Sequence, residues 1–258
     1  MQIKVGEESK MAKDQDFEKD FVRLKNVSKI YRMGEVEIRA VDKIEFAIDK
    51  GEFVVVVGPS GAGKTTVLNI LGGMDTVTSG DVLVDGENIA KYSQRKLTGY
   101  RRDDIGFVFQ FYNLVQNLTA LENVELPLVY MGIKTAQRKE KVNKVLEKVN
   151  LLHRANHYPQ QLSGGQQQRV AIARAVVTDC KLLLADEPTG NLDSVNGVEV
   201  MELLSELNRQ GTTIIIVTHS QRDATYAHRI IRLLDGQIVS ENINRPLEKS
   251  TSSKNEAV

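Results

Sequence analysis

The chain has 258 residues, and its 34 lysine and arginine residues balance 34 aspartate and glutamate residues. A net charge of zero argues against a dedicated nucleic-acid-binding protein, because such proteins usually carry a basic surplus that displaces counterions from phosphates. Hydrophobic residues make up 41% of the chain, which is typical of a globular protein. The single cysteine, Cys180, cannot form an intramolecular disulfide, and this favours a reducing compartment.

The apolar runs are short, and runs such as 53–57 and 214–217 fall far below the ~20 residues of a membrane-spanning helix. The first 20 residues are charged and lack the apolar core of a secretory signal, so we expect a cytoplasmic protein. Residues 1–20 and 241–258 are polar, and we interpret them as flexible tails. One domain is then expected over residues 21–240.

Strand and helix patterns alternate along this domain, which predicts an α/β fold. The run Phe53–Val57 is apolar throughout, as expected of a strand covered on both faces. The dipeptides Asp85-Gly86 and Asp235-Gly236 predict two hairpins. Further strands are predicted at residues 22–27, 44–48, 81–84, 88–89, 182–185, 212–217, 230–234 and 237–240.

Two stripes of apolar residues with helical spacing lie at 142–149 and 200–207, and we assign them to packing rather than chemistry. The stretch from about residue 95 to 165 is mostly helical in pattern and interrupts the succession of strands. We interpret it as a helical subdomain inserted into the α/β core.

A phosphate-binding loop is the most specific motif, because it matches G-x-x-x-x-G-K-[ST] in full between a buried strand and a helical segment. Glycines let such a loop turn its N–H groups toward a phosphate. A lysine there reaches the β- and γ-phosphates, and a hydroxyl binds Mg²⁺. A glycine-rich turn with a surface lysine is the weaker alternative. The candidate ATP-binding residues are Gly58, Pro59, Ser60, Gly61, Ala62, Gly63, Lys64, Thr65 and Thr66.

A pair of carboxylates follows the apolar run 182–185 and so falls at the carboxyl end of a predicted strand, where α/β folds bind ligands. Asp186 is the candidate Mg²⁺ ligand, and Glu187 is the candidate general base that polarises the attacking water. An Asp-Glu pair alone would more often lie in a solvated loop, but the phosphate loop upstream favours the functional interpretation.

A further motif reads Leu162-Ser163-Gly164-Gly165-Gln166-Gln167-Gln168-Arg169 and precedes a helix. Its last residue, Arg169, lies 17 residues before Asp186. With this LSGGQ signature, the chain resembles the ATP-binding subunits of ABC transporters over residues 21–240. The resemblance implies a P-loop NTPase core of the RecA-like type, an antiparallel β subdomain and the inserted helical subdomain. It also implies ATP and Mg²⁺ as cofactors.

Four further positions match this family's motifs in order. Tyr31 corresponds to the aromatic residue that stacks on adenine, and Gln110 to the Q-loop glutamine that reaches Mg²⁺ and the attacking water. Asp193 lies in the D-loop, and His219 corresponds to the switch histidine near the γ-phosphate. Each of these residues alone would more often be structural. No motif includes His153, His157, His228 or Cys180, and we expect structural roles for them.

In the family, Ser163, Gly164, Gly165 and Gln166 close on the nucleotide that the other subunit binds. The resemblance therefore implies a head-to-tail homodimer that closes on two ATP molecules and opens after hydrolysis. It also implies a transmembrane permease subunit on a separate chain, and hence a cytoplasmic location at the inner face of the membrane. Every catalytic position is filled, namely Lys64, Gln110, Glu187 and His219, so an active ATPase is expected.

The segments 101–110 and 121–128 most resemble the ATPases of macrolide exporters, lipoprotein-releasing complexes and antimicrobial-peptide permeases. In the family, residues corresponding to 111–128 form the groove that receives the permease's coupling helix. Phe111 and Gln116-Asn117 depart from the common pattern of this subgroup. Two alternatives remain open: an ATPase of cell-division signalling, and a non-transport ATPase of DNA repair. The neutral charge and the single ATPase unit favour a transporter without nucleic acid.

Overall fold

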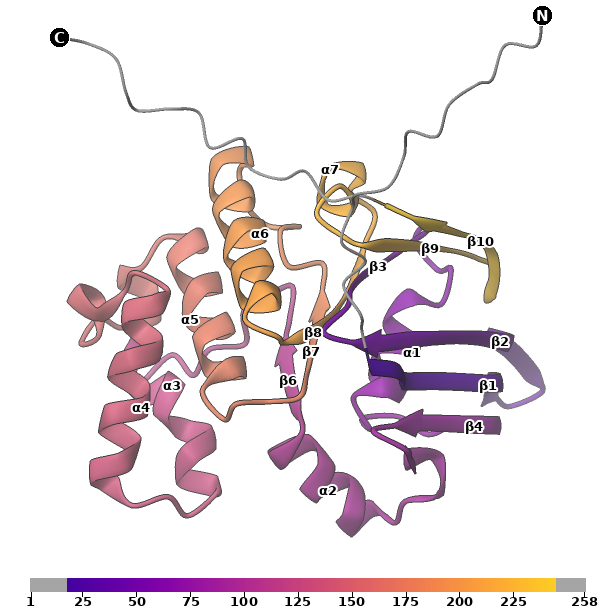
Figure 1. The fold of residues 1–258 in the computed structure, drawn as a ribbon, viewed down its shortest axis with the longest axis horizontal. Coiled ribbons are helices and arrows are strands. Elements are labelled where there is room, and N and C mark those ends of the chain that lie inside the picture. The colour runs from indigo at the N-terminus through magenta and orange to yellow at the C-terminus, as the bar shows by residue number, and fades with distance from the viewer. Residues whose placement is uncertain (1–17, 245–258) are drawn as a thin grey trace, which may run out of the picture.

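Two β-sheets organise the part of the chain that the computed structural model describes, residues 18–244 (Figure 1). The larger sheet has the order β10-β9-β3-β8-β7-β6 and is parallel except for β10. The smaller sheet is antiparallel, with the order β2-β1-β4-β5. This arrangement confirms the predicted α/β core and its antiparallel β subdomain.

The strands are β1 (Glu18–Met33), β2 (Val36–Lys50), β3 (Phe53–Val57), β4 (Ser79–Val84), β5 (Glu87–Asn88), β6 (Ile105–Val108), β7 (Leu182–Asp186), β8 (Thr213–Thr218), β9 (Arg229–Leu234) and β10 (Gln237–Ile243). The α-helices are α1 (Lys64–Leu71), α2 (Gln94–Asp103), α3 (Ala120–Tyr130), α4 (Thr135–Lys148), α5 (Gly164–Val176), α6 (Ser194–Arg209) and α7 (Gln221–Ala224).

The central strands β3, β7 and β8 are covered on both faces, which explains why their sequences are apolar throughout. Alternate residues, such as Val54, Leu184 and Ile215, join one apolar cluster with α1 and the antiparallel sheet. Their neighbours Val55, Leu183 and Ile214 join a second cluster with α5 and α6. The same strands therefore hold both layers of helices to one rigid sheet.

A third apolar cluster lies beside this core, where α3, α4 and α5 pack together away from the antiparallel sheet (Figure 1). Val124 and Leu128 of α3 meet Val142 and Leu146 of α4, and all four side chains are buried. The helical stripe predicted at 142–149 thus packs inside this unit. The stripe at 200–207 likewise faces the core from α6.

Strand β6 departs from the prediction of a helical stretch from about residue 95 to 165. It pairs with β7 in the larger sheet, and α2 packs into the core cluster through Leu97 and Tyr100. Four residues are too few to show the alternation of apolar and polar residues that identifies a strand, so the sequence pattern does not reveal β6 between its neighbouring helices. Helices α3 and α4 lie within that stretch and pack together with α5.

Both predicted two-residue hairpins are confirmed. Asp85, Gly86, Asp235 and Gly236 all have positive φ angles, between 46° and 77°, as a type I′ turn requires. The strand predicted at 88–89 is displaced, because Ile89 begins the 3-10 turn Ile89–Lys91.

The predicted tails are shorter than expected, since residues 18–20 belong to β1 and residues 241–243 to β10. Asn244 is also described, and its side chain donates to Ala227 O at 3.1 Å. Residues 1–17 and 245–258 of the predicted tails lie outside the described residues. Between residues 18 and 244, no helix combines the length and apolarity needed to cross a bilayer.

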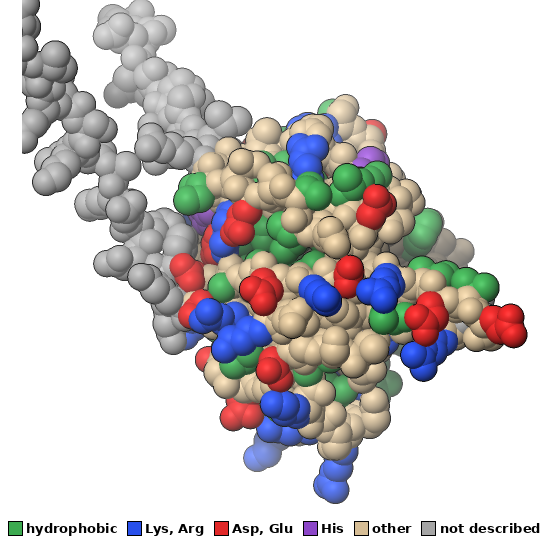
Figure 2. Space-filling view, turned by 90° about the vertical axis from the view of Figure 1, so that its right-hand side faces the viewer, with side chains coloured by type: hydrophobic (Ala, Val, Ile, Leu, Met, Phe, Trp, Pro, Cys, Tyr) green, Lys and Arg blue, Asp and Glu red, His purple; other side chains and the backbone are tan. Residues whose placement is uncertain are grey.

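Acidic and basic side chains are interspersed on the face that lies at the right of Figure 1, on the side of the antiparallel sheet (Figure 2). Exposed ion pairs of the antiparallel subdomain include Arg32–Glu37 and Lys91–Asp81, with N–O distances of 3.0 and 3.2 Å. On this face, positive and negative side chains of the described residues thus lie close to one another, and neither sign forms a large patch.

Shortening a core side chain tests the two-sided burial of the sheet. Leu184→Ala should lower the free energy of unfolding by about 2–5 kcal/mol, because a fully buried leucine leaves a cavity beside α1. Leu234→Ala is the matched control: its side chain is largely exposed on β9, and a change near 0.5 kcal/mol is expected. Urea unfolding checks both values, and equal losses would contradict the described packing.

Candidate functional site

The phosphate loop leaves the carboxyl end of β3 and runs into α1. Gly61 and Gly63 have φ angles of +81° and +97°, a region that glycine occupies without strain. Gly58 is required for a different reason, because a Cβ atom there would lie 2.2 Å from the carbonyl oxygen of Leu233 in β9. The hairpin that follows β9 also holds the loop, since Gly236 N donates to Ala62 O at 3.1 Å.

The ammonium group of Lys64 lies against this loop. Its Nζ donates to the carbonyl oxygens of Gly58 and Pro59, both at 2.9 Å, and the side chain is buried. A positive charge is thereby held beside the backbone that the phosphates of a nucleotide would contact.

Thr65 and Asp186 face each other across the gap between α1 and β7. The Thr65 hydroxyl lies 3.3 Å from Asp186 Oδ1. Burial raises the pKa of Asp186 above its ordinary value, and the charge of Glu187 acts in the same direction. A partly desolvated carboxylate beside a hydroxyl is an oxygen pair that suits Mg²⁺, which takes few protein ligands and completes its shell with water and phosphate.

No cluster of three or more acidic, histidine or cysteine side chains that could hold a metal occurs within residues 18–244. A dedicated all-protein cage is therefore absent from the described chain. The Thr65–Asp186 pair fits the other kind of site, in which the nucleotide itself supplies part of the coordination.

The carboxylate of Glu187 is held by two groups at the end of β8. Thr218 Oγ1 donates to Glu187 Oε2 at 3.0 Å, and His219 Nδ1 lies 2.9 Å from Glu187 Oε1. The Glu187 side chain is 14% exposed, and the His219 ring is 70% exposed. The structure thus brings together two of the predicted catalytic residues, with one face of the imidazole open to solvent.

The backbone of Glu187 is itself unusual, with a φ angle of +45°. A non-glycine residue in the left-handed region costs roughly 1 kcal/mol and persists only where its surroundings hold it. One such constraint is the bond from Glu187 N to Val217 O at 2.9 Å. Strained residues of this kind cluster at functional sites.

Gln110 follows β6 and lies beside the loop that carries Glu187. Its carbonyl oxygen accepts from Asn191 Nδ2 at 2.9 Å, and its amide nitrogen lies 3.2 Å from the position that a Cβ atom would take on Gly190. Further along the same segment, Tyr112 and Asn113 have positive φ angles, and Arg174 of α5 donates to both of their carbonyl oxygens.

The predicted signature residues form the start of α5. Ser163 is the N-cap, and its side chain and that of Gln166 satisfy each other's backbone N–H groups in a capping box. Gly165 must be glycine, because a Cβ atom would lie 2.1 Å from Asn196 Oδ1 of α6. In the described chain, no hydrogen bond joins residues 163–166 to the phosphate loop.

Asp193 caps α6. Its carboxylate accepts from the backbone N–H groups of Val195 and Asn196 and from the Asn196 side chain. The backbone hydrogen bond from Asn196 is the main reason why the pKa of Asp193 lies below its ordinary value. The structure shows Asp193 as the N-cap of α6, and its predicted contact with nucleotide stays a prediction.

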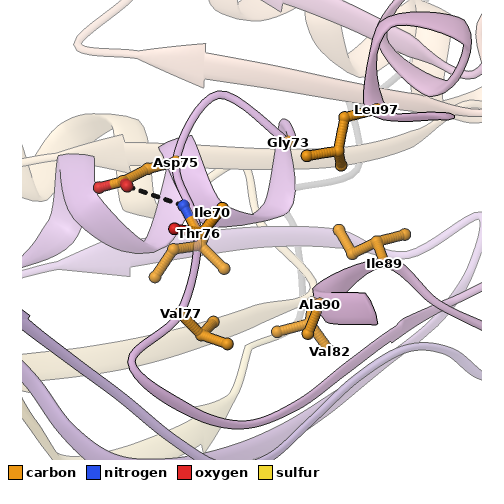
Figure 3. A pocket seen from close by; sticks show the side chains of 9 residues that line it. All are labelled: Ile70, Gly73, Asp75, Thr76, Val77, Val82, Ile89, Ala90 and Leu97. Carbon is orange, nitrogen blue, oxygen red and sulfur yellow. Dashed lines mark hydrogen bonds between the residues drawn. The ribbon is translucent and has the colours of Figure 1, made fainter. Parts of the chain in front are cut away.

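Tyr31 presents a partly exposed ring on β1 and is fixed by its hydroxyl. The hydroxyl donates to Asp75 Oδ2 at 2.6 Å, and Lys29 Nζ donates to Asp75 Oδ1 at 2.5 Å. Although burial opposes it, these hydrogen bonds hold the pKa of Asp75 below its ordinary value. Figure 3 shows Asp75 at the rim of a narrow apolar pocket, with its carboxylate directed away from Leu97 and Ile89.

Two of the histidines expected to be structural have partners within the fold, whereas His153 is exposed. His228 Nδ1 accepts from Phe53 N at 2.9 Å, and His157 Nε2 lies 2.9 Å from a nitrogen of Arg154. Cys180 is buried, and desolvation raises the pKa of its thiol to about 12. Such a thiol does not act as a nucleophile near neutral pH.

Sequence reasoning missed three polar residues around Glu187: Thr218, which holds its carboxylate, and the buried side chains of Gln168 and Asp223. Thr218 directly precedes His219, and this adjacency is the only signal that could have indicated it. Gln168 and Asp223 carry no signal, because their partners are distant in the chain.

Adding a methyl group to Gly58 tests the packing of the phosphate loop. Gly58→Ala should destabilise the fold by about 1–3 kcal/mol and abolish ATP binding, since the new Cβ must displace either the loop or β9. Gly99→Ala on α2 is the matched control, because no atom lies within 4 Å of its new Cβ. Thermal unfolding and fluorescent-nucleotide titration check both variants, and unchanged ATP binding in Gly58→Ala would contradict the described contact.

Comparison with known proteins agrees with this geometry. The sequence profile described as "ABC transporter" matches residues 41–190, more than half of the chain. An uncharacterized ABC transporter ATP-binding protein of Thermotoga maritima is 48% identical over 88% of this chain and 96% of its own length. A macrolide export ATP-binding/permease protein of Hyphomonas neptunium is 46% identical over 87% of this chain, which spans only 35% of that protein.

Among solved structures, the ATP-binding cassette MJ0796 superimposes with a TM-score of 0.81 at 46% identity. The match covers 88% of this chain and all of that one. One such structure is a dimer in a post-hydrolysis state with ADP and phosphate, and another is described as a dimeric bacterial ABC transporter cassette. The fold is the P-loop ABC ATPase fold, and the chain belongs to the ABC transporter family as an ATP-binding, ATP-hydrolysing cassette.

Proposed function

We propose that this chain binds ATP with Mg²⁺, closes as a homodimer on two nucleotides, and drives a membrane permease carried by a separate chain. The observation that supports the ATPase site most directly is the placement of Glu187. Its carboxylate contacts Thr218 and His219. Glu187 directly follows Asp186 in the chain, and Asp186 faces Thr65 at the phosphate loop. Acid–base and phosphate-binding groups thus converge at one edge of the sheet.

In this site, Lys64 and the loop N–H groups would hold the phosphates of ATP, and Thr65 and Asp186 would hold Mg²⁺. The metal ion would offset negative charge on the transferred phosphoryl group. Glu187 orients a water molecule and accepts its proton. One ring nitrogen of His219, Nδ1, contacts the carboxylate of Glu187, and the rest of the ring is exposed. The exposed side of the ring could donate a hydrogen bond to an oxygen of the γ-phosphate. Gln110 lies beside the same loop, and its side-chain amide would reach Mg²⁺ and the attacking water.

Dimerisation completes the site in this proposal. The backbone N–H groups of Gly164 and Gly165 at the start of α5 make an anion site, and within the chain they have no hydrogen bond to the phosphate loop. A second copy would bring its own signature to this loop, and Tyr31 would stack on the adenine. Support comes from the dimeric structures of the similar cassette MJ0796.

A permease can dock at a cavity of about 550 Å³ between α2, β6, α3 and α5. Phe107, Leu126 and Tyr130 make part of its wall apolar. Arg101 and Arg174 also line it, and each donates only to uncharged oxygens in the described part of the chain. We therefore expect the permease to dock here through an amphipathic cytoplasmic helix that carries a carboxylate. Bound in this way, the chain would lie at the inner face of the membrane.

The relatives support a permease of the exporter type. In the macrolide export proteins, the matched region is about a third of a chain named ATP-binding/permease, so the permease part lies outside the region matched here. An ATPase of cell-division signalling would use the same cavity, whereas a DNA-repair ATPase would bring nucleic acid with it. Co-purification distinguishes these outcomes.

Removing the proposed general base tests the catalytic assignment. Glu187→Gln should bind ATP, form a stable dimer and turn over about 10²–10⁴-fold more slowly, because the amide cannot accept the proton. Steady-state phosphate release and size-exclusion chromatography with ATP provide the measurements. Turnover within a factor of two of the parent would refute the assignment of Glu187.

A charge in the proposed permease cavity tests the docking site. Tyr130→Asp should abolish co-purification with the proposed permease subunit, while basal ATPase activity stays within about twofold. Val239→Asp on β10 is the matched control, since this exposed apolar residue lies outside the cavity. Equal recovery of the membrane subunit with both variants would contradict this docking site.

A further inference from the structure

Gln168 is a fully buried amide in the middle of the signature helix α5. Its Nε2 donates to the carbonyl oxygen of Pro188 at 2.7 Å. Its Oε1 is also buried and has no hydrogen-bond partner in the described structure. The side chain therefore makes one strong contact, directed at the loop that follows Asp186 and Glu187.

This arrangement is unfavourable for stability alone. A buried oxygen without a partner carries its full desolvation cost, and a methionine of similar length would avoid that cost. Unlike a methionine, the amide of Gln168 can donate a hydrogen bond to Pro188 O. Pro188 follows Glu187, whose left-handed φ angle needs external support.

A second buried contact holds the other end of the same loop. The Thr189 hydroxyl bonds to Asp223 Oδ2, and Asp223 is fully buried at the start of α7. The backbone N–H of Asp223 in turn donates to Ser220 Oγ, one residue after His219. The loop 187–189 is thus held by the signature helix at Pro188 and by the switch-histidine segment at Thr189.

We propose that Gln168 is a positioning residue for the ATPase reaction: its amide fixes the Glu187 loop to the signature helix, so that the position of α5 sets the position of the base. The proposal rests on the function proposed above for Glu187 and for residues 163–166. Gln168 lies about one turn along α5 from Gly164. If α5 shifts as a rigid body when its start contacts the nucleotide of a second copy, the amide of Gln168 moves with it. The hydrogen bond to Pro188 O then transmits this shift to the loop that carries Glu187.

Gln168→Met in the full chain removes the donor and keeps the length of the side chain. The expected result is a kcat lower by about ten- to a hundredfold, because a displacement near 1 Å at the base is enough for such a loss. The KM for ATP and the affinity for fluorescent ATP should stay within about twofold, since the phosphate loop is untouched. Thermal unfolding should shift by less than about 4 °C.

Asn208→Leu is the matched control. Asn208 is also a buried amide, and its Nδ2 donates to the carbonyl oxygens of Gly51 and Thr212, away from the site. This variant should keep the parental kcat whatever its effect on stability. The same kcat loss in both variants would show a general effect of losing a buried amide and would overturn the proposal.

Combining Gln168→Met with Glu187→Gln separates a positioning role from a structural one. If Gln168 acts through Glu187, its substitution should change single-turnover hydrolysis by less than about twofold once the carboxylate is gone. Additive losses in the double variant, an unchanged kcat in Gln168→Met, or loss of its fold would each overturn the proposal. A parent chain without ATPase activity would instead contradict the proposed function.

Discussion

The parallel register of β3, β8 and β7 is the constraint on which the whole site depends. Val57 pairs with Thr218, and Asp186 pairs with Val217, so the three strands end at the same level. The phosphate loop, the switch histidine and the carboxylate pair then leave the sheet side by side. A slip of one residue in either ladder would turn these side chains to the opposite face of the sheet.

Burial on both faces keeps this register in place. Helix α1 and the antiparallel sheet cover one face, and α5 and α6 cover the other, so the strand ends form a rigid support. The loop after β7 carries backbone strain, with Glu187 in a left-handed conformation. A stable sheet thus holds a loop geometry that would not persist alone.

The sequence predicts the local parts of this structure and misses the non-local ones. The phosphate loop, the buried strands and both Asp-Gly hairpins are recognisable because their residues are adjacent in the chain. Strand β6 is missed because four residues are too few to show a period. Gln168 and Asp223 are missed because their partners, Pro188 and Thr189, lie 20 and 34 residues away. Sequence periodicity carries no information on such contacts.

The central claim is that one strand edge brings Lys64, Asp186 and Glu187 to a single nucleotide, which a second copy completes. The most direct test is an experimental structure of the Glu187→Gln variant with ATP and Mg²⁺. The account predicts a dimer in which Ser163 of one copy contacts the γ-phosphate at the other copy's loop, with a water molecule ~3 Å from the residue-187 side chain. A monomer with bound nucleotide, or a residue-187 side chain directed away from the γ-phosphate, would contradict it.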